Sequence, residues 1–117
     1  MSAETIVYDA LDVVGVTSKV GTNIYPGMLP QGKQLPAVIF VRTGTEHVTT
    51  IHSSASLGQK ATIEILAIAE KFKTAEEIAD AVEVAMIAVT GAPVDRRQEI
   101  DPETGAFLTI LTYGVWA

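Results

Sequence analysis

Residues 74–91 carry the clearest alternation of hydrophobic and polar positions in the chain, and this pattern predicts one amphipathic helix. The apolar residues recur at steps of three and four and form a single stripe: Ala75, Ile78, Ala79, Val82, Ala85, Met86 and Val89. Thr74 and Glu77 have the spacing of a capping box, which predicts the start of the helix. Gly91 stands where a left-handed C-terminal cap is expected. A stripe of this kind needs a sheet to pack against.

Runs typical of strands lie on both sides of this helix. Residues 37–43 are rich in β-branched and aromatic side chains and are apolar on both faces. Residues 61–69 place Ile63 and Ile65 on one face, because side chains alternate along a strand. These two segments are the predicted partners of the helix on its N-terminal side.

The C-terminal part of the chain predicts a hairpin. Residues 94–100 are polar, which favours an edge strand, and residues 107–116 form an apolar last strand. Between them, Asp101 can accept a hydrogen bond from the backbone of its own turn, and Gly105 can supply a positive φ. The predicted turn therefore spans residues 101–105.

The N-terminal part and the middle of the chain are less regular. Residues 2–14 have the pattern of a first helix, which Gly15 can end. Residues 16–35 contain many glycines and prolines together with apolar anchors, which predicts an ordered loop. Residues 44–60 are polar, so we expect a long loop, with a short strand permitted near residues 46–51.

These elements predict one α+β domain over residues 1–117. We expect an antiparallel sheet of four to five strands with two helices packed on one face, in the order α-β-(β)-β-α-β-β. The strands at residues 37–41 and 107–116 are apolar on both faces, whereas two helices can cover one face only. The second face is therefore expected to meet another subunit, although the long segments 16–35 and 44–60 folding over it would explain the same pattern.

Composition excludes several classes of function. The chain has 14 acidic and 8 basic residues, a formal net charge of −6, and no cysteine. A broad basic surface for nucleic acid is therefore not expected, and neither are disulfides nor thiolate chemistry. No apolar run reaches the roughly 20 residues that cross a bilayer, and the acidic N-terminus is unlike a secretory signal. We expect a protein made and kept in a cytoplasm unless a particle carries it out.

Candidate chemical groups do not combine into a catalytic or metal site. His47 and His52 are the only histidines and have no third ligand at a fixed spacing. A turn explains Asp101 and Glu103 better than a calcium loop does. The serines near His52 lack an orienting partner, and the glycines near Lys33 do not lie between a strand and a helix as a phosphate-binding loop requires. The sequence predicts neither an enzyme nor a cofactor or metal.

Three segments together resemble a known family. Residues 24–27 (Ile-Tyr-Pro-Gly), 29–32 (Leu-Pro-Gln-Gly) and 35–40 (Leu-Pro-Ala-Val-Ile-Phe) are similar to the loop and first strand of the small tail-completion, or tail-terminator, proteins of long-tailed bacteriophages and prophages. The strand and helix in the middle of the chain fit that family in order and length. The turn at residues 101–105 and the final Val115-Trp116 resemble its C-terminal hairpin.

The resemblance implies a structural subunit without an active site. Such a subunit forms a ring, typically a hexamer, that caps the finished tail tube, meets the head connector and leaves a channel for DNA. Its partners would be further copies of itself, the tail tube protein and the connector protein, with no membrane. It would reside in the virion, and in the bacterial cytoplasm during assembly. The alternatives are another component of the head-tail connector, or a small-molecule-binding α+β dimer.

We expect the long polar segment 44–60 to supply the assembly contact. Segments of this length and polarity are often mobile until a partner orders them. The expected interface residues are Glu46, His47, Val48, Thr49, Ile51, His52 and Leu57.

Overall fold

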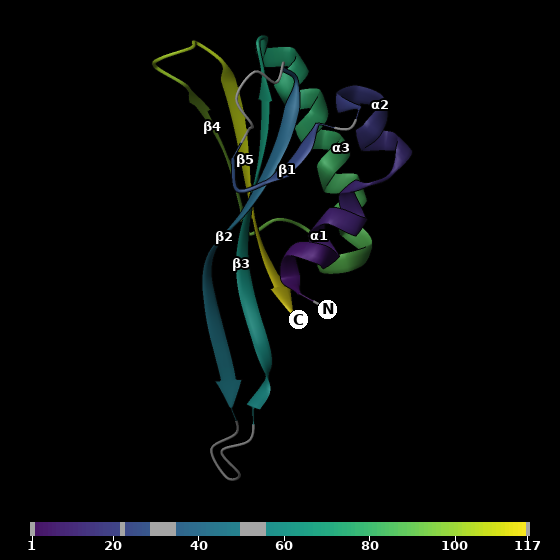
Figure 1. Cartoon of the computed structure of the whole chain (residues 1–117), viewed down its shortest axis with the longest axis vertical. Coiled ribbons are helices and arrows are strands. Elements are labelled where there is room, and N and C mark those ends of the chain that lie inside the picture. Colours follow the sequence, from purple (N-terminus) through teal and green to yellow (C-terminus); the bar gives the residue numbers. More distant parts are fainter. Residues whose placement is uncertain (1, 22, 29–34, 50–55, 117) are drawn as a thin grey trace.

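Three helices lie on one face of a mixed five-stranded sheet in this computed structural model, which describes residues 2–21, 23–28, 35–49 and 56–116 (Figure 1). The elements, in chain order, are α1 (Ala3–Leu11), α2 (Val14–Val20), β1 (Ile24–Pro26), β2 (Ala37–Thr49), β3 (Ser56–Ala69), α3 (Phe72–Thr90), β4 (Asp95–Ile100) and β5 (Phe107–Trp116). The strands are arranged β1-β2-β3-β5-β4 across the sheet. Only β1 runs parallel to its neighbour. The predicted α+β class is confirmed, and the sheet is antiparallel apart from this one short edge strand.

Helix α3 is the predicted amphipathic helix, but it begins before the predicted start. Its N-cap is Lys71, and no side chain caps its first turn, so the predicted capping box of Thr74 and Glu77 is wrong. The helix ends as predicted: Gly91 has a φ of +80°, and its N–H donates to a carbonyl in the last turn at 3.1 Å. The end of the helix was easier to predict because a glycine cap depends on backbone conformation alone.

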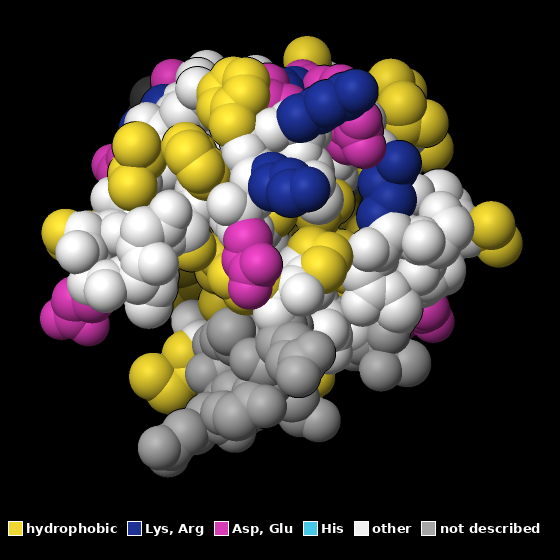
Figure 2. Space-filling model, turned by 90° about the horizontal axis from the view of Figure 1, so that it is seen from above, with side chains coloured by type: hydrophobic (Ala, Val, Ile, Leu, Met, Phe, Trp, Pro, Cys, Tyr) yellow, Lys and Arg dark blue, Asp and Glu magenta, His cyan; other side chains and the backbone are white. Residues whose placement is uncertain are grey.

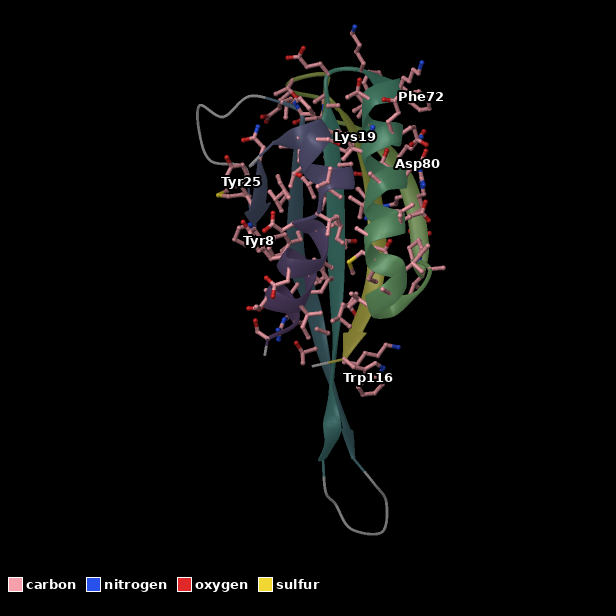
Figure 3. All side chains as sticks on the ribbon, turned by 90° about the vertical axis from the view of Figure 1, so that its right-hand side faces the viewer. Tyr8, Lys19, Tyr25, Phe72, Asp80 and Trp116 are labelled. Atoms are coloured by element: carbon pink, nitrogen blue, oxygen red, sulfur yellow. The ribbon has the colours of Figure 1, made fainter. Side chains whose placement is uncertain are left out.

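The stripe of α3 forms the centre of the core. Its deeply buried members, none more than 1% exposed, are Ala75, Ile78, Ala79, Val82 and Met86. Val89 was also assigned to this stripe, but it is 43% exposed near the end of the helix. The stripe packs against side chains of β3 and β5 that point to the same face, among them Ile63, Ile65, Leu111 and Tyr113. Figure 3 shows α1, α2 and α3 side by side in front of these strands.

The N-terminal segment contains two helices, where the sequence predicted one. Ser2 caps α1, because its Oγ accepts a hydrogen bond from the Thr5 N–H at 3.2 Å. The chain then turns at Asp12, and Gly15 lies inside α2 and does not end the first helix. The predicted loop 16–35 is therefore partly wrong, because it contains most of α2 and all of β1. Both elements are too short to show a clear period in the sequence.

The C-terminal hairpin was predicted correctly. β4 is an edge strand, and the turn that follows it holds Gly105 at a φ of +74°. The Asp101 carboxylate accepts from the Glu103 N–H at 2.9 Å, and this bond holds the pKa of Asp101 below its ordinary value. Asp101 also accepts the Gly105 N–H through its backbone carbonyl at 2.8 Å.

The sheet face opposite the helices is less exposed than the sequence predicted. Ile39, Leu66 and Ile110 are register neighbours across β2, β3 and β5 on this face. Ile39 is 7% exposed and Ile110 is 4% exposed, although Figure 1 shows no helix on this side. The large exposed apolar residues therefore lie elsewhere, at the ends of the sheet and on the outer surface of the helices.

Candidate assembly surface

Strands β2 and β3 continue past the body of the molecule as a two-stranded ribbon (Figure 1). We define the ribbon as residues 46–49 of β2 and 56–60 of β3. Its cross-strand partners run from Glu46 opposite Lys60 to Thr49 opposite Ser56, with a register shift between Val48 and Thr49. Neither arm has a further strand beside it beyond the level of Trp116, the last residue of β5, which lies opposite Lys60. An isolated two-stranded ribbon is only marginally stable in water, so contact with a partner would stabilise it.

The ribbon contains most of the residues predicted for the assembly contact. Glu46, His47, Val48 and Thr49 lie in β2, and Leu57 lies on the opposite arm in β3. The prediction of a long loop over residues 44–60 is therefore wrong for residues 44–49 and 56–60, although the short strand permitted near residues 46–51 is present as far as Thr49. The ribbon projects beyond the helices (Figure 1), so packing against them does not impose an apolar alternation on its strands. Ile51 and His52 lie outside the described residues.

A second surface lies at the base of the ribbon, next to the end of β5. It is a groove of about 360 Å³ lined by Lys60, Val89, Thr90, Ala92, Val94, Gly114, Val115 and Trp116. Val94 is 76% exposed and Trp116 is 55% exposed. Sequence reasoning did not identify this groove, because its residues come from α3, β3, β5 and the segment before β4. The exposed tryptophan close to the C-terminal end was the available signal.

A third surface, on the outer side of the helices, is also apolar. Val84 and Ile87 of α3 are 71% and 62% exposed, and Val14 at the start of α2 is 80% exposed. A shallow depression of about 530 Å³ lies between these two helices. The predicted stripe of α3 did not include Val84 and Ile87, because they fall on the polar face of that helix.

A polar network fastens β4 to α3. The Arg96 guanidinium donates to Glu76 at 2.8 Å, to Asp80 at 3.0 Å and also to Glu83. Glu76 also accepts from Gln98 and, at 2.9 Å, from the Oγ1 of the buried Thr109. Burial alone would raise the pKa of Glu76, but the hydrogen bonds from Gln98, Thr109 and Arg96 outweigh it and leave that pKa below its ordinary value.

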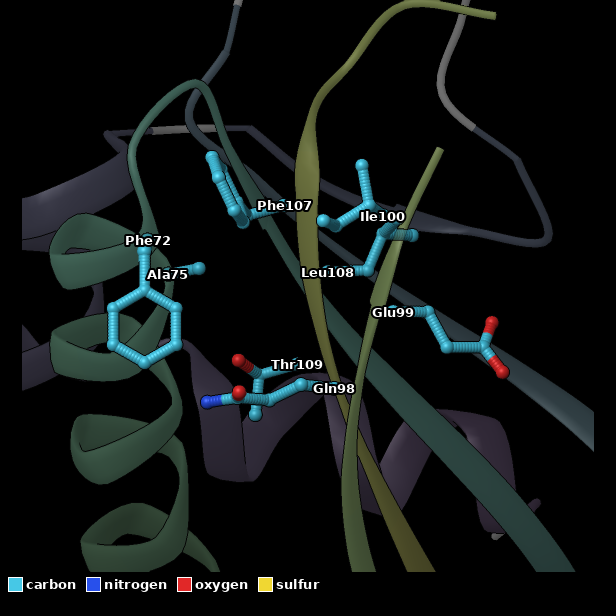
Figure 4. Close-up of a pocket in the computed structure, with 8 residues that line it drawn as sticks. All are labelled: Phe72, Ala75, Gln98, Glu99, Ile100, Phe107, Leu108 and Thr109. Atoms are coloured by element: carbon cyan, nitrogen blue, oxygen red, sulfur yellow. The ribbon is translucent and has the colours of Figure 1, made fainter. Parts of the chain in front are cut away.

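This network explains the polar residues of the cleft in Figure 4. The cleft has a volume of about 390 Å³ and lies between the start of α3 and the β4–β5 hairpin. Gln98 and Thr109 line it, but both are bound to Glu76, and the Glu99 side chain points away from the helix. The remaining lining is mainly apolar. The cleft therefore offers no free acid, base or nucleophile.

The Tyr113 hydroxyl lies beneath this network without a hydrogen-bond partner among the described residues. The side chain is fully buried. Burial raises the pKa of Tyr113 to about 12; the charge of Glu83 adds to this rise and the charge of Arg96 opposes it. The hydroxyl is therefore neutral at physiological pH and costs the fold an unsatisfied polar group.

The arginines are engaged in ion pairs with the molecule's own carboxylates. Arg97 pairs with Glu64 at 3.2 Å and with two carboxylates of its own strand, and Arg42 pairs with Glu4 at 2.5 Å. At the end of the molecule opposite the ribbon, basic, acidic and hydrophobic side chains are interspersed (Figure 2). No uniformly basic surface forms on that face.

Within the described residues, no three acidic, histidine or cysteine side chains converge as metal ligands would. His47 lies in the ribbon, and His52 lies outside the part of the chain that the structure describes. None of the described helices is long and apolar enough to cross a membrane.

Comparison with known proteins gives a family and a fold. A family model described as "Tail completion protein gp17" matches residues 6–117. Among solved structures, a chain of the particle described as "Virion of native gene transfer agent (GTA) particle" superposes with a TM-score of 0.69 at 17% sequence identity. The match covers 94% of this chain and 90% of that one, which shows a common fold over nearly the full length. No curated protein matches the chain.

Proposed function

Because the chain belongs to the family of tail completion proteins described as gp17, we propose that it is the structural subunit that caps the finished tail tube and joins it to the head connector. The capping ring stops the addition of further tube subunits and leaves a channel for DNA. The family match across residues 6–117 is the observation that carries this proposal. The subunit then resides in the virion, and in the host cytoplasm during assembly.

A ring of identical subunits, typically six in a tail terminator, is the proposed working form. Closed rings require a heterologous contact, in which two different patches of the subunit meet. The chain offers such patches: the ribbon, the groove at its base and the exposed apolar side of α3. Exposed residues such as Val94 and Trp116 would lose their contact with water in the ring.

The charge distribution suits a conduit for DNA. The formal net charge is −6, and Arg42, Arg96 and Arg97 are all paired with carboxylates. A lumen lined by free basic groups would bind DNA through counterion release and would slow its passage. An acidic subunit with neutralised arginines lets DNA slide.

The job needs no catalysis, and the clefts support a non-enzymatic role. The cleft beside α3 has the volume of a small-molecule site, but its polar side chains are bound to Glu76. A small-molecule-binding dimer is therefore the weaker alternative.

The ribbon is the proposed contact with a neighbouring subunit or with the tube. It projects from the body and carries Glu46, His47, Val48, Thr49 and Leu57 on its two arms. Ile51 and His52 remain part of the proposed contact by their position between those arms in the sequence. The polarity of the ribbon suits a surface that must stay in water before assembly.

Complementation tests this assignment. A phage that carries Glu46→Lys together with His47→Glu should produce a folded subunit but tails that are misterminated or fail to join heads. The matched control is Glu103→Lys, which reverses an exposed charge in the turn between β4 and β5, at the opposite end of the molecule. Infectious particles from both variants would remove the ribbon from the assembly contact.

Localisation and stoichiometry separate the remaining possibilities. Cryo-EM of virions should place the subunit at the head-proximal end of the tail tube, and native mass spectrometry of the released complex should give the number of copies. A position within the connector itself would assign the chain to another neck component. A dimer with no place in the virion would overturn the proposed function.

A further inference from the structure

Both edges of the sheet are open at the same level, just above the ribbon. On one side, β1 pairs with β2 only as far as Phe40, so no described strand pairs with the outer edge of β2 from Val41 onward. On the other side, β4 pairs with β5 only as far as Thr112, so no described strand pairs with the outer edge of β5 from Tyr113 onward. The sheet is therefore three strands wide at this level, with a free strand on each side.

The register places these two free edges opposite each other. Gly44 of β2 is aligned through Thr62 of β3 with Gly114 of β5. Two residues further, Glu46 is aligned through Lys60 with Trp116. Residues 44–46 and residues 114–116 are thus the two sides of one level of the sheet.

At the uncovered edge of β5, the backbone N–H and C=O groups point outward, and β4 does not pair with them. The Thr112 carbonyl accepts from the Val94 N–H at 2.7 Å, which shows that the polar groups of Thr112 face β4. Backbone groups alternate in direction along a strand, so those of Gly114 and Trp116 face the same edge, beyond the point where β4 begins. These groups can pair with an added strand.

Other edges of the sheet carry features that discourage pairing. The outer edge strand β4 is charged at Asp95, Arg96, Arg97 and Glu99, and β1 ends at Pro26. Charges and proline are the devices by which proteins protect edge strands. Residues 114–116, by contrast, are Gly, Val and Trp and carry no charge.

The strand directions suit a cyclic assembly. β2 and β5 are both antiparallel to β3, so they run in the same direction. Rotation about an axis roughly along the strands keeps both the level and the direction of every strand. It therefore brings β5 of one copy beside β2 of the next as a parallel pair at matching levels. The same operation repeated around the axis closes the ring and leaves no free edge at this level.

We propose that neighbouring copies of this chain continue one β-sheet around the ring, through a parallel pair between residues 114–116 of β5 in one copy and residues 44–46 of β2 in the next. This inference rests on the proposed ring and names the contact that closes it. The added strand would also cover the groove beside Val94 and Trp116, which are among the most exposed apolar residues.

Engineered disulfides test the contact directly, because the chain has no cysteine of its own. Within one copy, positions 46 and 116 are two strands apart, about 10 Å at the usual strand spacing. That separation exceeds the ~7 Å limit for a disulfide between Cα atoms, so any bond must join two copies. The probes are tails assembled from a mixture of Glu46→Cys and Trp116→Cys subunits, oxidised and separated under denaturing conditions.

The mixture should give a covalent dimer that contains one copy of each variant, and the double variant should give a ladder of covalent oligomers. Each variant alone should give no dimer, because the contact is heterologous. Gly44→Cys with Gly114→Cys is a second pair of positions, two residues from the first. It tests the same contact if strand tilt shifts the two copies relative to each other. A Cβ at Gly44 meets open space, and one at Gly114 meets only the flexible end of Lys60. Glu99→Cys with Glu46→Cys is the matched control on the charged edge and should give no dimer.

Each result has a distinct meaning. Tails that contain the subunit in a ring but yield neither cross-link overturn the continuous sheet and leave the proposed function intact. Dimers from one single variant alone, or from the control pair, also overturn the contact, because they place different edges together. Virions that lack the subunit overturn the proposed function and this inference with it.

Discussion

The body of the sheet and the ribbon are made from the same two strands, yet they rely on different interactions. In the body, residues of β3 such as Ile63 and Ile65 are fully buried beneath the helices. In the ribbon, the same strand has a single partner strand and no helix over it. The difference lies within one hairpin: one half packs under the helices and stabilises the subunit, and the other half projects beyond them.

The comparison predicts that stability depends on the body alone, and the largest effect is expected inside α3. Val82→Asp would place an unpaired charge at a position that is 0% exposed. The expected loss is on the order of the 5–15 kcal/mol by which small domains are stable, so the variant should be unfolded. Val84→Asp, at a 71% exposed position of the same helix, is the control and should melt like the parent. Equal melting of the two variants by circular dichroism would contradict the assignment of the helix faces.

A smaller loss is expected where the edge of the body is fastened to α3. Arg96→Met removes the cation shared by Glu76, Asp80 and Glu83 and leaves their charges uncompensated. We expect a loss of about 1–2 kcal/mol, discounted because the groups are partly exposed. Arg97→Met breaks the more exposed pairs on the other face and should cost less than Arg96→Met does. Urea denaturation of both variants would measure the difference. An equal loss would show that the Arg96 network stabilises the fold no more than the exposed ion pairs of Arg97 do.

A gain in stability is expected from one substitution in the body. Tyr113→Phe removes the buried hydroxyl that has no partner among the described residues, and this should stabilise the fold by about 1 kcal/mol. The pKa of Tyr113 is raised from 10 to about 12, so the tyrosine of the unfolded chain ionises first, and the fold loses stability as the pH rises from 10 toward 12. The variant should lack this alkaline loss. Destabilisation by the substitution would show that the hydroxyl has a partner.

The smallest effect on folding is expected in the ribbon. Val48→Asp should leave the melting temperature of the subunit unchanged, within about 0.5 kcal/mol of stability, because this part of the hairpin projects beyond the helices. Amide exchange should also be faster at residues 46–49 than at residues 63–67 and should slow on assembly. Equally slow exchange in the free subunit would show that the ribbon is as stable as the body, which contradicts the difference proposed between them.

Elements with a core on one side could be predicted from the sequence. The stripe of α3, the alternation of β3 and the turn that ends at Gly105 each follow from local pattern or backbone conformation. The start of α3 could not be predicted, because Thr74 and Glu77 have a suitable spacing but Lys71 takes the N-cap position without a side-chain hydrogen bond. β1 has three residues and is held by parallel pairing with a distant strand, which no local pattern reveals.

The position of the ribbon outside the body was predicted, but its form was predicted only in part. The polar composition of residues 44–60 indicated a segment outside the core, and residues 46–49 and 56–60 project beyond the helices (Figure 1). The composition permitted a short strand near residues 46–51 but did not indicate the two full arms, because apolar alternation arises where one face of a strand packs against a core. The groove that contains Trp116 and Val94 joins four parts of the chain, so only the fold could bring its residues together.

The bulge at the base of the ribbon is a point about which the hairpin can pivot. The register of β2 shifts between Arg42 and Gly44, and Arg42 is tied there to Glu4 of α1 at 2.5 Å and to Thr45 at 3.1 Å. From Arg42 to Thr49 the strand forms a lever about 23 Å long, at ~3.3 Å per residue. A rotation of about 10° at this joint would move the far end of that lever by about 4 Å, close to the spacing of neighbouring strands. A shift of α1 against β2 would therefore displace the far end of the ribbon by about one strand spacing.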